Sequence, residues 1–523
     1  MEHVNPLDHM GDKLRRYVTR FDRILFVCVF GMAILVHLYM FTHKFINHDD
    51  VGGLYSSCGF GLSSGRWLLH FAATLTGSFS SSWVNGVAGS LYMAAAAVLI
   101  TRLFRVRRYV PALLMGLCLV SFPVLASTYA YMFSSSPYLF ALMLAALGAL
   151  LIRQETIPAM LAGSVAIALS MGCYQAYFAL AATLLVVVLG LDLLEDCFGG
   201  NWKAFLLTGI KYVLFLGLGM VLYLVILKVR LWMTGVELVS YQGISSMGQI
   251  TLGQLLQRIV AAYKGFAKFC LDHQGTVNQN GIFLTGFPVL VFLSGCLSLG
   301  CAAVAAVTGK LFRRPVMMAF LLLLMAIFPL ATCLVYVMTE PLFVHHVMIY
   351  PLVIPLILPA IALDRLTLPA GGRVRRQAAL LTAAALLAVL IATAYQFVMV
   401  TNRAYFYMEI TYENVYAFYT KLETKVELHE GFTPDAPVAF IGTASMDSYV
   451  PNANMTGIMT GNQALNIYSL GHYLMYFHGT RYNFVSPEKE AEIMATGEFQ
   501  QMPVYPAAGS IQTINGVITV RLS

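Results

Sequence analysis

Long apolar runs separated by polar loops dominate the first 400 residues. The runs lie at about 24–41, 83–101, 110–127, 137–152, 157–172, 176–194, 212–228, 282–307, 315–337, 346–363 and 378–399. Most approach or exceed the roughly 20 residues that an α-helix needs to cross a hydrocarbon core about 30 Å thick. Residues 157–194 are too long for a single crossing, and Gly172 offers a break near their middle. The pattern predicts an all-α polytopic membrane protein with about 11 transmembrane helices.

Lysine and arginine residues in the short loops predict the orientation. Alternate loops carry groups of basic residues, such as Arg102 to Arg108 and Lys310 to Arg314, whereas the opposite loops at 128–136, 173–175 and 339–345 carry none. Because these residues concentrate in cytoplasmic loops, we expect the N-terminus inside and the C-terminus outside. The larger segments at about 42–82 and 229–281, and the residues after 400, then face outside.

The composition agrees with a membrane protein and argues against several functions. Hydrophobic residues make up 59% of the 523 residues and charged residues 11%, against about 25% charged in soluble domains. The net charge of +7 is explained by the basic inside loops, so no nucleic-acid partner is expected. The nine cysteines form no CxxC pair and predict neither disulfides nor a metal site. The inside loops are short and carry no P-loop or G-x-G-x-x-G motif, so we expect the chemistry on the outer face.

The last part of the chain, residues 401–523, is polar and predicts a small extracytoplasmic α+β domain after a transmembrane domain of residues 1–400. Val438 to Ile441 indicate a buried strand. Ser486 and Pro487 are typical of a helix start, and that helix is expected to run to Thr496, with Gly497 just past its end. Residues 510–522 predict a β-hairpin that turns at Asn515-Gly516.

Two adjacent carboxylates follow the first apolar run, in the sequence Asn47, His48, Asp49, Asp50. A charge at a membrane surface is costly to bury, and adjacent like charges raise one of the two pKa values, which suits a base. Neighbouring residues point in different directions, so we expect one working base and one positioning or metal-binding carboxylate. The alternative is an ordinary solvated loop, and a divalent metal held by Asp49 and Asp50 stays open.

Other polar residues near the outer ends of the runs are candidates for donor binding. Arg66, whose planar fork suits a phosphate, and the neighbouring Trp67 are candidates for holding the donor phosphate or sugar. Arg66 could equally be an interfacial arginine beside Trp67. Tyr174 and Gln175, at an outer turn, could bind sugar hydroxyls, although a plain turn with an interfacial tyrosine is the simpler interpretation.

Two further candidate sets lie later in the chain. His345 and His346 lack the i, i+4 spacing of a helical metal pair and could contact phosphate or simply lie at the interface. Residues 252–268 predict an amphipathic helix on the membrane, with cations such as Arg258 and Lys264 toward headgroups or a lipid phosphate. The polar residues at 402–413 are interpreted as a linker to the C-terminal domain.

The order of these motifs resembles the GtrII-type glucosyltransferases. The resemblance rests on Asn47 to Asp50, Ser64 to Trp67, Gly172 to Ala176 and the segment Met502 to Pro506. It implies a GT-C-type membrane enzyme that takes glucose from a polyprenyl-phosphate donor and adds it to a bacterial surface polysaccharide, such as an O-antigen, or to another lipid-linked glycan. The active site would face outside the cytoplasmic (inner) membrane. An acidic residue of the first outer loop is the base in such enzymes, which corresponds here to Asp49 or Asp50. Relatives often carry a basic residue near the outer end of a late span, where this chain has His345 and His346.

The residues and the resemblance together favour a single displacement. A carboxylate would take the proton of an acceptor hydroxyl, which attacks the anomeric carbon while the polyprenyl phosphate leaves. Two other functions stay open. A polymerase or ligase of lipid-linked oligosaccharides would share the outer polar loops, and it would require an oligosaccharyl pyrophosphate. A transporter or flippase would usually place ionisable groups at mid-span, where this chain has almost none.

Overall fold

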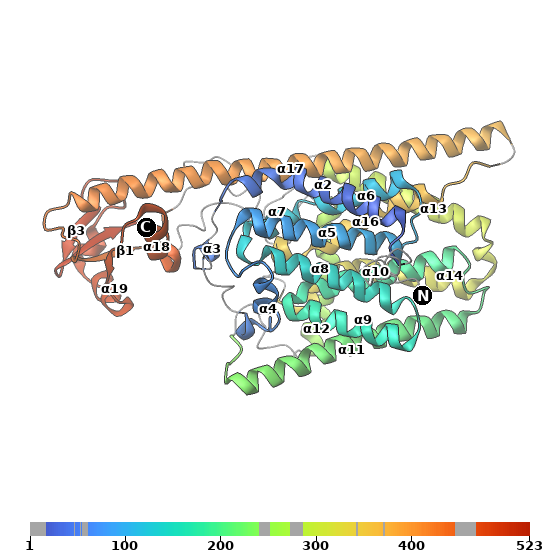
Figure 1. Cartoon of the computed structure of the whole chain (residues 1–523), viewed down its shortest axis with the longest axis horizontal. Helices are drawn as coiled ribbons and strands as arrows, with labels where there is room; N and C mark the ends of the chain where they lie inside the picture. Colours follow the sequence, from blue (N-terminus) through green and yellow to red (C-terminus); the bar gives the residue numbers. More distant parts are fainter. Residues whose placement is uncertain are drawn as a thin grey trace, which may run out of the picture.

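The structure is a computed structural model, and it describes residues 17–45, 48–52, 54, 61–239, 251–271, 286–340, 344–369, 372–444 and 467–523. Asn47 and the side chain of His48 lie outside the described residues. The described chain is mostly helical, with a small sheet near its C-terminal end (Figure 1).

The helical body runs from α2 to α16, and the short helices α3, α4 and α15 lie in the loops between its longer helices. The helices of its first half are α2 (Arg20–Thr42), α3 (His48–Gly52), α4 (Leu69–Thr74), α5 (Ser82–Leu103), α6 (Tyr109–Ser121), α7 (Val124–Ala130), α8 (Met132–Ile152), α9 (Ile157–Cys173) and α10 (Phe178–Leu194). Those of its second half are α11 (Trp202–Thr234), α12 (Leu252–Leu271), α13 (Phe287–Thr308), α14 (Pro315–Thr332), α15 (Val335–Met338) and α16 (Ile354–Arg365).

All eleven predicted runs overlap helices, but they are not all full-length spans. Among the described residues, eight helices are long and apolar enough to cross a membrane, or nine when α6 and α7, which meet at 45°, count as one. Helix α9 has 17 residues. Helix α16 has 12 and follows two short 3-10 turns, so it would span only about 18 Å at 1.5 Å per residue. The predicted break after Gly172 is confirmed, because α9 ends at Cys173 and a new helical turn starts at Gln175.

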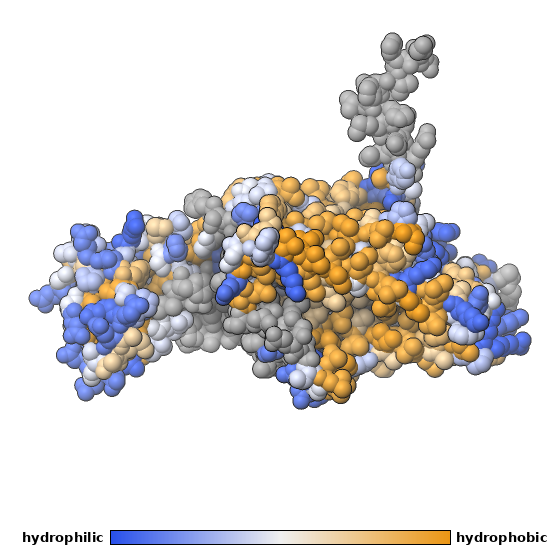
Figure 2. Space-filling model, turned by 90° about the horizontal axis from the view of Figure 1, so that it is seen from below, coloured by the Kyte–Doolittle hydropathy of each residue, from blue (hydrophilic) through white to orange (hydrophobic). Residues whose placement is uncertain are grey.

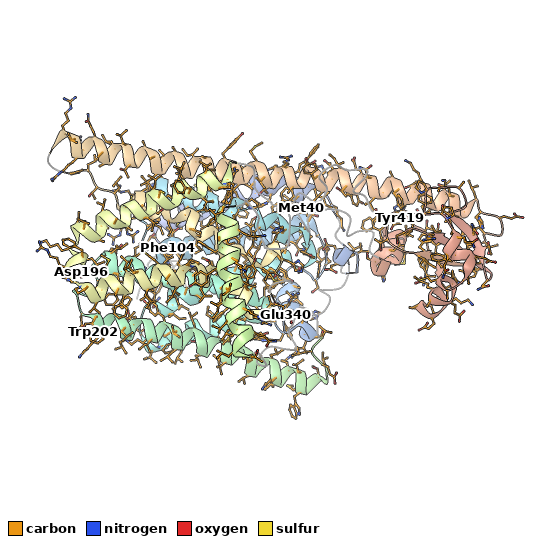
Figure 3. The ribbon with its side chains drawn as sticks, turned by 180° about the vertical axis from the view of Figure 1, so that it is seen from behind. Met40, Phe104, Asp196, Trp202, Glu340 and Tyr419 are labelled. Atoms are coloured by element: carbon orange, nitrogen blue, oxygen red, sulfur yellow. The ribbon has the colours of Figure 1, made fainter. Side chains whose placement is uncertain are left out.

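The surface divides into an apolar belt and two polar ends. Figure 2 shows hydrophobic residues over the helical body, with hydrophilic residues at the C-terminal end and at the opposite end. Phe104, Asp196 and Trp202 mark one end of the body, and Met40 and Glu340 lie toward the other (Figure 3). Such a belt is the surface that a lipid bilayer covers.

Helix α12 lies crosswise to its neighbours, and it is the yellow-green helix that stands upright near the centre of Figure 3. It packs against α13, α14 and α15. The amphipathic pattern predicted that the cations of this helix face headgroups or a lipid phosphate together, but in the structure they occupy different environments. Arg258 is 8% exposed and donates a hydrogen bond of 3.3 Å to the Val337 carbonyl, so it does not point toward headgroups, whereas Lys264 is exposed.

Helix α17 (Arg373–Glu427) is 55 residues long and runs past the whole body to the C-terminal sheet (Figure 1). The residues expected to form a linker at 402–413 are therefore helical, and no break occurs at residue 400. Val400, Ala404, Met408, Val415 and Tyr419 are buried along this part. Their spacing keeps the helical period although the composition becomes polar, because one face of the helix stays packed.

The C-terminal unit consists of the last turns of α17 and the described residues after 427. Its strands are β1 (Pro437–Ile441), β2 (Asn483–Phe484), β3 (Ile511–Ile514) and β4 (Val517–Arg521), in the order β2-β1-β4-β3, and its helices are α18 (Ile467–Tyr473), α19 (Pro487–Met494) and α20 (Gly497–Gln501). A π-helical turn, Leu474–His478, follows α18. Strand β1 is parallel to β2 and β4, whereas β3 and β4 are antiparallel.

The local predictions for this unit are largely confirmed. Asn515 and Gly516 have φ of 50° and 76°, as a two-residue hairpin turn requires, and they join β3 to β4. Ser486 accepts a hydrogen bond from the Lys489 N–H at the start of α19. Gly497, however, begins α20 with Thr496 as its N-cap, so it is not a residue that only follows α19.

Candidate active site

Asp50, in α3, is buried against the start of α8 and is 1% exposed. The backbone N–H groups of Met132 and Phe133 donate hydrogen bonds to its carboxylate over 3.3 and 2.9 Å, and the Ser80 hydroxyl donates another over 3.2 Å. Met132 and Phe133 open α8, where N–H groups have no partner inside the helix and the dipole favours an anion. Asp50 therefore anchors α3 to the helical body.

Asp49 occupies a different environment from its neighbour. It is half-buried, whereas Asp50 is buried. Successive residues of a helix are rotated by about 100° around its axis, so the two carboxylates do not share one site. The structure thus gives the two acids separate positions, one inside a set of backbone donors and one with partial access to solvent.

Val51, the next residue of α3, is packed into the C-terminal unit. It is completely buried and belongs to the same hydrophobic cluster as Val415, Tyr419, Tyr473 and Leu474. Helix α3 lies between the helical body and the C-terminal unit (Figure 1). The acidic helix is consequently held from two sides, by Asp50 on the body and by Val51 on the C-terminal unit.

Hydrogen bonds hold the segments around Ser64 and Gln175 together. The Gln175 side-chain amide donates to the Ser64 carbonyl over 3.0 Å and to the Tyr223 hydroxyl over 3.1 Å, and that hydroxyl donates to the Gly65 carbonyl over 3.1 Å. Gly65 has φ of +78°, and a Cβ there would lie 2.8 Å from both the Gln175 amide nitrogen and the Tyr223 oxygen. Gln175 was one candidate for binding sugar hydroxyls, with a plain turn as the simpler interpretation; in the structure its amide holds the loop that carries Arg66.

Trp67 joins the same two segments by packing. It is 8% exposed, and its ring lies so close to Gly172 that a Cβ there would come within 2.7 Å of it. The Leu68 N–H also donates to the Gly172 carbonyl over 2.8 Å. The structure therefore places Trp67 in a packed interior and not at an exposed membrane interface.

Arg66 lies against two tyrosines, Tyr138 of α8 and Tyr174 just after the end of α9. Its guanidinium carbon is 5.3 Å from the Tyr174 ring centroid and 5.7 Å from that of Tyr138, whose hydroxyl accepts a hydrogen bond of 3.0 Å from it. The two tyrosine rings stack with centroids 4.2 Å apart. Arg66 is half-buried. Tyr174 thus contributes an aromatic face for a cation, and nothing in the sequence pointed to Tyr138.

His346 begins a 3-10 turn beside α7, and His345 is the residue just before that turn. His346 is completely buried, and neither ring nitrogen has a hydrogen-bond partner within the described part of the chain. Burial lowers the pKa of His345 below its ordinary value. A buried, neutral imidazole is a weak partner for a phosphate, so of the two alternatives the phosphate contact is the less favoured at this pair.

A cavity of about 460 Å³ lies next to the anchored Asp50. Ser80, which donates to Asp50, is one of its lining residues, together with Lys44, Trp83, Tyr476 and Phe477. Burial lowers the pKa of Lys44, and the nearby Asp50 carboxylate opposes that shift. No pattern in the sequence indicated that Tyr476 and Phe477 would meet the loop that follows the first long helix, about 400 residues earlier in the chain.

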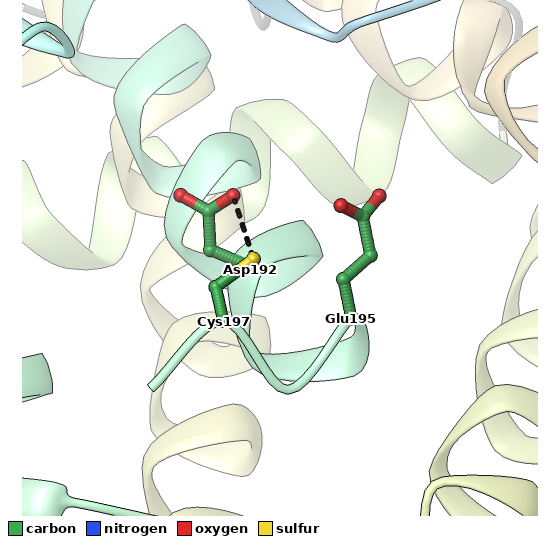
Figure 4. A group of neighbouring side chains, drawn as sticks. All are labelled: Asp192, Glu195 and Cys197. Atoms are coloured by element: carbon green, nitrogen blue, oxygen red, sulfur yellow. Dashed lines mark hydrogen bonds between the residues drawn. The ribbon is translucent and has the colours of Figure 1, made fainter. Parts of the chain in front are cut away.

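A second acidic cluster lies at the opposite end of the body. Asp192, Glu195 and Cys197 have the spacing of a metal site, and the Cys197 thiol donates to Asp192 over 3.8 Å (Figure 4). Arginines neutralise its carboxylates, with Arg153 2.7 Å from Asp192 and Arg365 2.5 Å from Glu195. The cluster is therefore an ion-pair network that ties the ends of several helices together.

The fold and these polar segments define a polytopic membrane protein with an acidic helix and an arginine-aromatic group at one end of its apolar belt. Residues 38–357 match the family described as Glucosyl transferase GtrII, and the match covers more than half of the chain. The protein belongs to this GtrII glucosyl transferase family, as the resemblance implied. The matched region includes Asp49, Asp50, Arg66, Tyr174 and Gln175. No curated protein and no solved structure matches the chain.

Proposed function

We propose that the protein transfers glucose from a polyprenyl-phosphate donor to an O-antigen-like surface polysaccharide of a bacterium. Membership of the family supports glucosyl transfer to a surface polysaccharide. The polyprenyl-phosphate donor, the O-antigen-like acceptor and a GT-C-type mechanism go beyond what family membership implies, and they are proposed here. The proposed orientation has the basic loops and the N-terminus inside, eleven crossings that include α9 and α16, and the acidic helix outside the cytoplasmic membrane.

The separate environments of Asp49 and Asp50 carry the proposal. Asp50 accepts hydrogen bonds from two backbone N–H groups and one hydroxyl, which favours a positioning role over a metal-ligand role. Asp49 is half-buried on the same short helix, where a substrate hydroxyl can approach it. A rigid neighbour that fixes the helix lets Asp49 work as a positioned base.

The proposed reaction is one displacement at the anomeric carbon. Asp49 accepts the proton of the acceptor hydroxyl as its oxygen forms a bond to that carbon, and the bond from the carbon to the phosphate oxygen breaks. The bonding electrons leave with the polyprenyl phosphate, whose added negative charge Arg66 stabilises. Asp49 then returns the proton to water. A single displacement inverts the configuration at the anomeric carbon.

A defined donor tests this function. Purified protein in lipid nanodiscs receives glucosyl-phosphoryl-polyprenol with labelled glucose and a polysaccharide acceptor. We expect transfer of one glucose per acceptor unit, with the anomeric configuration inverted in the NMR spectrum of the product. Transfer from a nucleotide sugar instead, or a requirement for an oligosaccharyl pyrophosphate, would refute the proposed donor.

A further inference from the structure

The cavity beside Asp50 has walls from two parts of the chain. One wall is the outer end of α2 with Lys44 and the residues that lead into α5, and the other is the π-helical turn with Tyr476 and Phe477. The Lys44 ammonium lies 5.9 Å from the Phe477 ring centroid, so the two walls meet. Its volume of about 460 Å³ falls within the roughly 300–1,000 Å³ usual for small-molecule sites.

The lining chemistry suits a saccharide. Three large aromatic residues of the lining keep exposed surface: Phe79 is 41%, Trp83 54% and Tyr476 41% exposed. Ser81 and Ser82, which are partly exposed, provide hydroxyl groups on the wall beside them. A pyranose has apolar C–H faces and a rim of hydroxyls, so exposed rings next to hydroxyl groups match both of its surfaces.

The position of the cavity suits the glycan acceptor better than the lipid-linked donor. Tyr476 and Phe477 belong to the C-terminal unit, which lies beyond the apolar belt at a hydrophilic end of the molecule (Figure 2). A prenyl chain would remain beside the belt, whereas a glycan that extends into water would reach the space between the two units. Ser80 connects the cavity directly to Asp50 and hence to the helix that carries Asp49.

We infer that this cavity is the acceptor subsite, where Tyr476 and Trp83 hold one or two sugar units of the polysaccharide that receives the glucose. The inference rests on the proposed function and names the part of the chain that selects the acceptor. Tyr476 lies outside residues 38–357, so this wall comes from a region that the family match does not cover. The C-terminal unit thereby gains a role in substrate binding.

Steady-state kinetics of the full-length protein in nanodiscs test the inference. Tyr476→Ala and Trp83→Ala are each expected to raise KM for the acceptor about ten-fold, with KM for the donor and kcat unchanged, as expected when uniform binding is lost. Tyr476→Phe, which keeps the ring, is expected to stay near the wild type. Phe406→Ala is the matched control, because Phe406 is 52% exposed and does not line the cavity.

The outcomes distinguish this inference from the proposed function. Wild-type protein that fails to use glucosyl-phosphoryl-polyprenol would refute the proposed function itself. An active wild type whose acceptor KM is unchanged by both alanine variants would overturn only the acceptor subsite. A rise in donor KM with constant acceptor KM would also overturn it, since the cavity would then hold the donor. An unchanged thermal unfolding midpoint shows that each variant is folded.

Discussion

The backbone N–H of Phe133 donates a hydrogen bond of 2.9 Å to the carboxylate of Asp50, 83 residues earlier in the chain. This contact ties the acidic helix α3 to the first turn of α8. It explains how a five-residue helix, too short to be stable alone, is held in one place. It also distinguishes Asp50, which is buried and holds the helix in place, from the adjacent Asp49, which is half-buried.

Loss of the Asp50 carboxylate is expected to weaken the fold. Asp50→Ala leaves the first N–H groups of α8 and the Ser80 hydroxyl without their acceptor. The free energy of unfolding should fall by about 1–3 kcal/mol, the cost of buried donors without partners. Thermal unfolding in detergent measures the change. Asp435→Ala makes the same change at an exposed position of the C-terminal unit and is the matched control. It should leave the midpoint almost unchanged, and equal effects of the two variants would contradict the anchoring role.

Gly65→Ala is expected to disrupt the loop that carries Arg66. The residue has φ of +78°, and its added Cβ would collide with Gln175 and Tyr223. We expect a loss of about 1–3 kcal/mol in stability and a matching loss of transfer activity. Gly217→Ala, in helix α11 with no atom within 4 Å of the added Cβ, should be neutral or slightly stabilising. A fully active, stable Gly65→Ala protein would show that the loop does not need this conformation.

Replacement of Arg66 by lysine tests the arginine-aromatic group. Lysine keeps the charge but loses the planar fork that bonds Tyr138 and lies over Tyr174. We expect kcat to fall about ten-fold or more. The chain offers a matched control in Arg403, whose guanidinium lies 5.5 Å from the Tyr407 ring centroid and donates to its hydroxyl over 3.2 Å. Arg403→Lys should leave kcat unchanged, and the same loss in both variants would argue against a specific role for Arg66.

Val51 is expected to couple the C-terminal unit to catalysis. Val51→Ala removes packing between α3 and the cluster around Tyr419 and Tyr473, which should cost more than about 1 kcal/mol and raise hydrogen exchange in α3. Transfer activity should fall with it. Val415→Ala makes the same change in the same cluster from α17, and it should affect activity less, because α3 keeps its contact. Equal loss of activity would indicate a general stability effect instead.

Local patterns in the sequence predicted the helices and the hairpin well. Apolar runs and turn residues act over a few positions, so the break after Gly172 and the turn at Asn515-Gly516 were visible in the sequence. The end of the last span was not. The composition becomes polar after residue 400 because one face of α17 is exposed there, yet the opposite face stays packed through Tyr419 and the helix continues.

The sequence identified the residues of the candidate site better than it identified their contacts. Asp50, Gln175 and Trp67 were singled out as chemical groups, whereas the structure gives each a positioning contact with a distant segment. Such contacts depend on how the helices pack, which no local pattern encodes. The contact of Ser80 with Asp50, and that of Tyr476 with the loop after α2, follow only from the tertiary structure.

Transfer activity of Asp49→Asn is the most direct test of the account, measured in nanodiscs with glucosyl-phosphoryl-polyprenol and the polysaccharide acceptor. An amide cannot take the proton of the acceptor hydroxyl, so we predict that kcat falls by about 10²–10⁴-fold, with the thermal unfolding midpoint and the KM for the donor unchanged. A variant that keeps near wild-type kcat would contradict the assignment of Asp49 as the base.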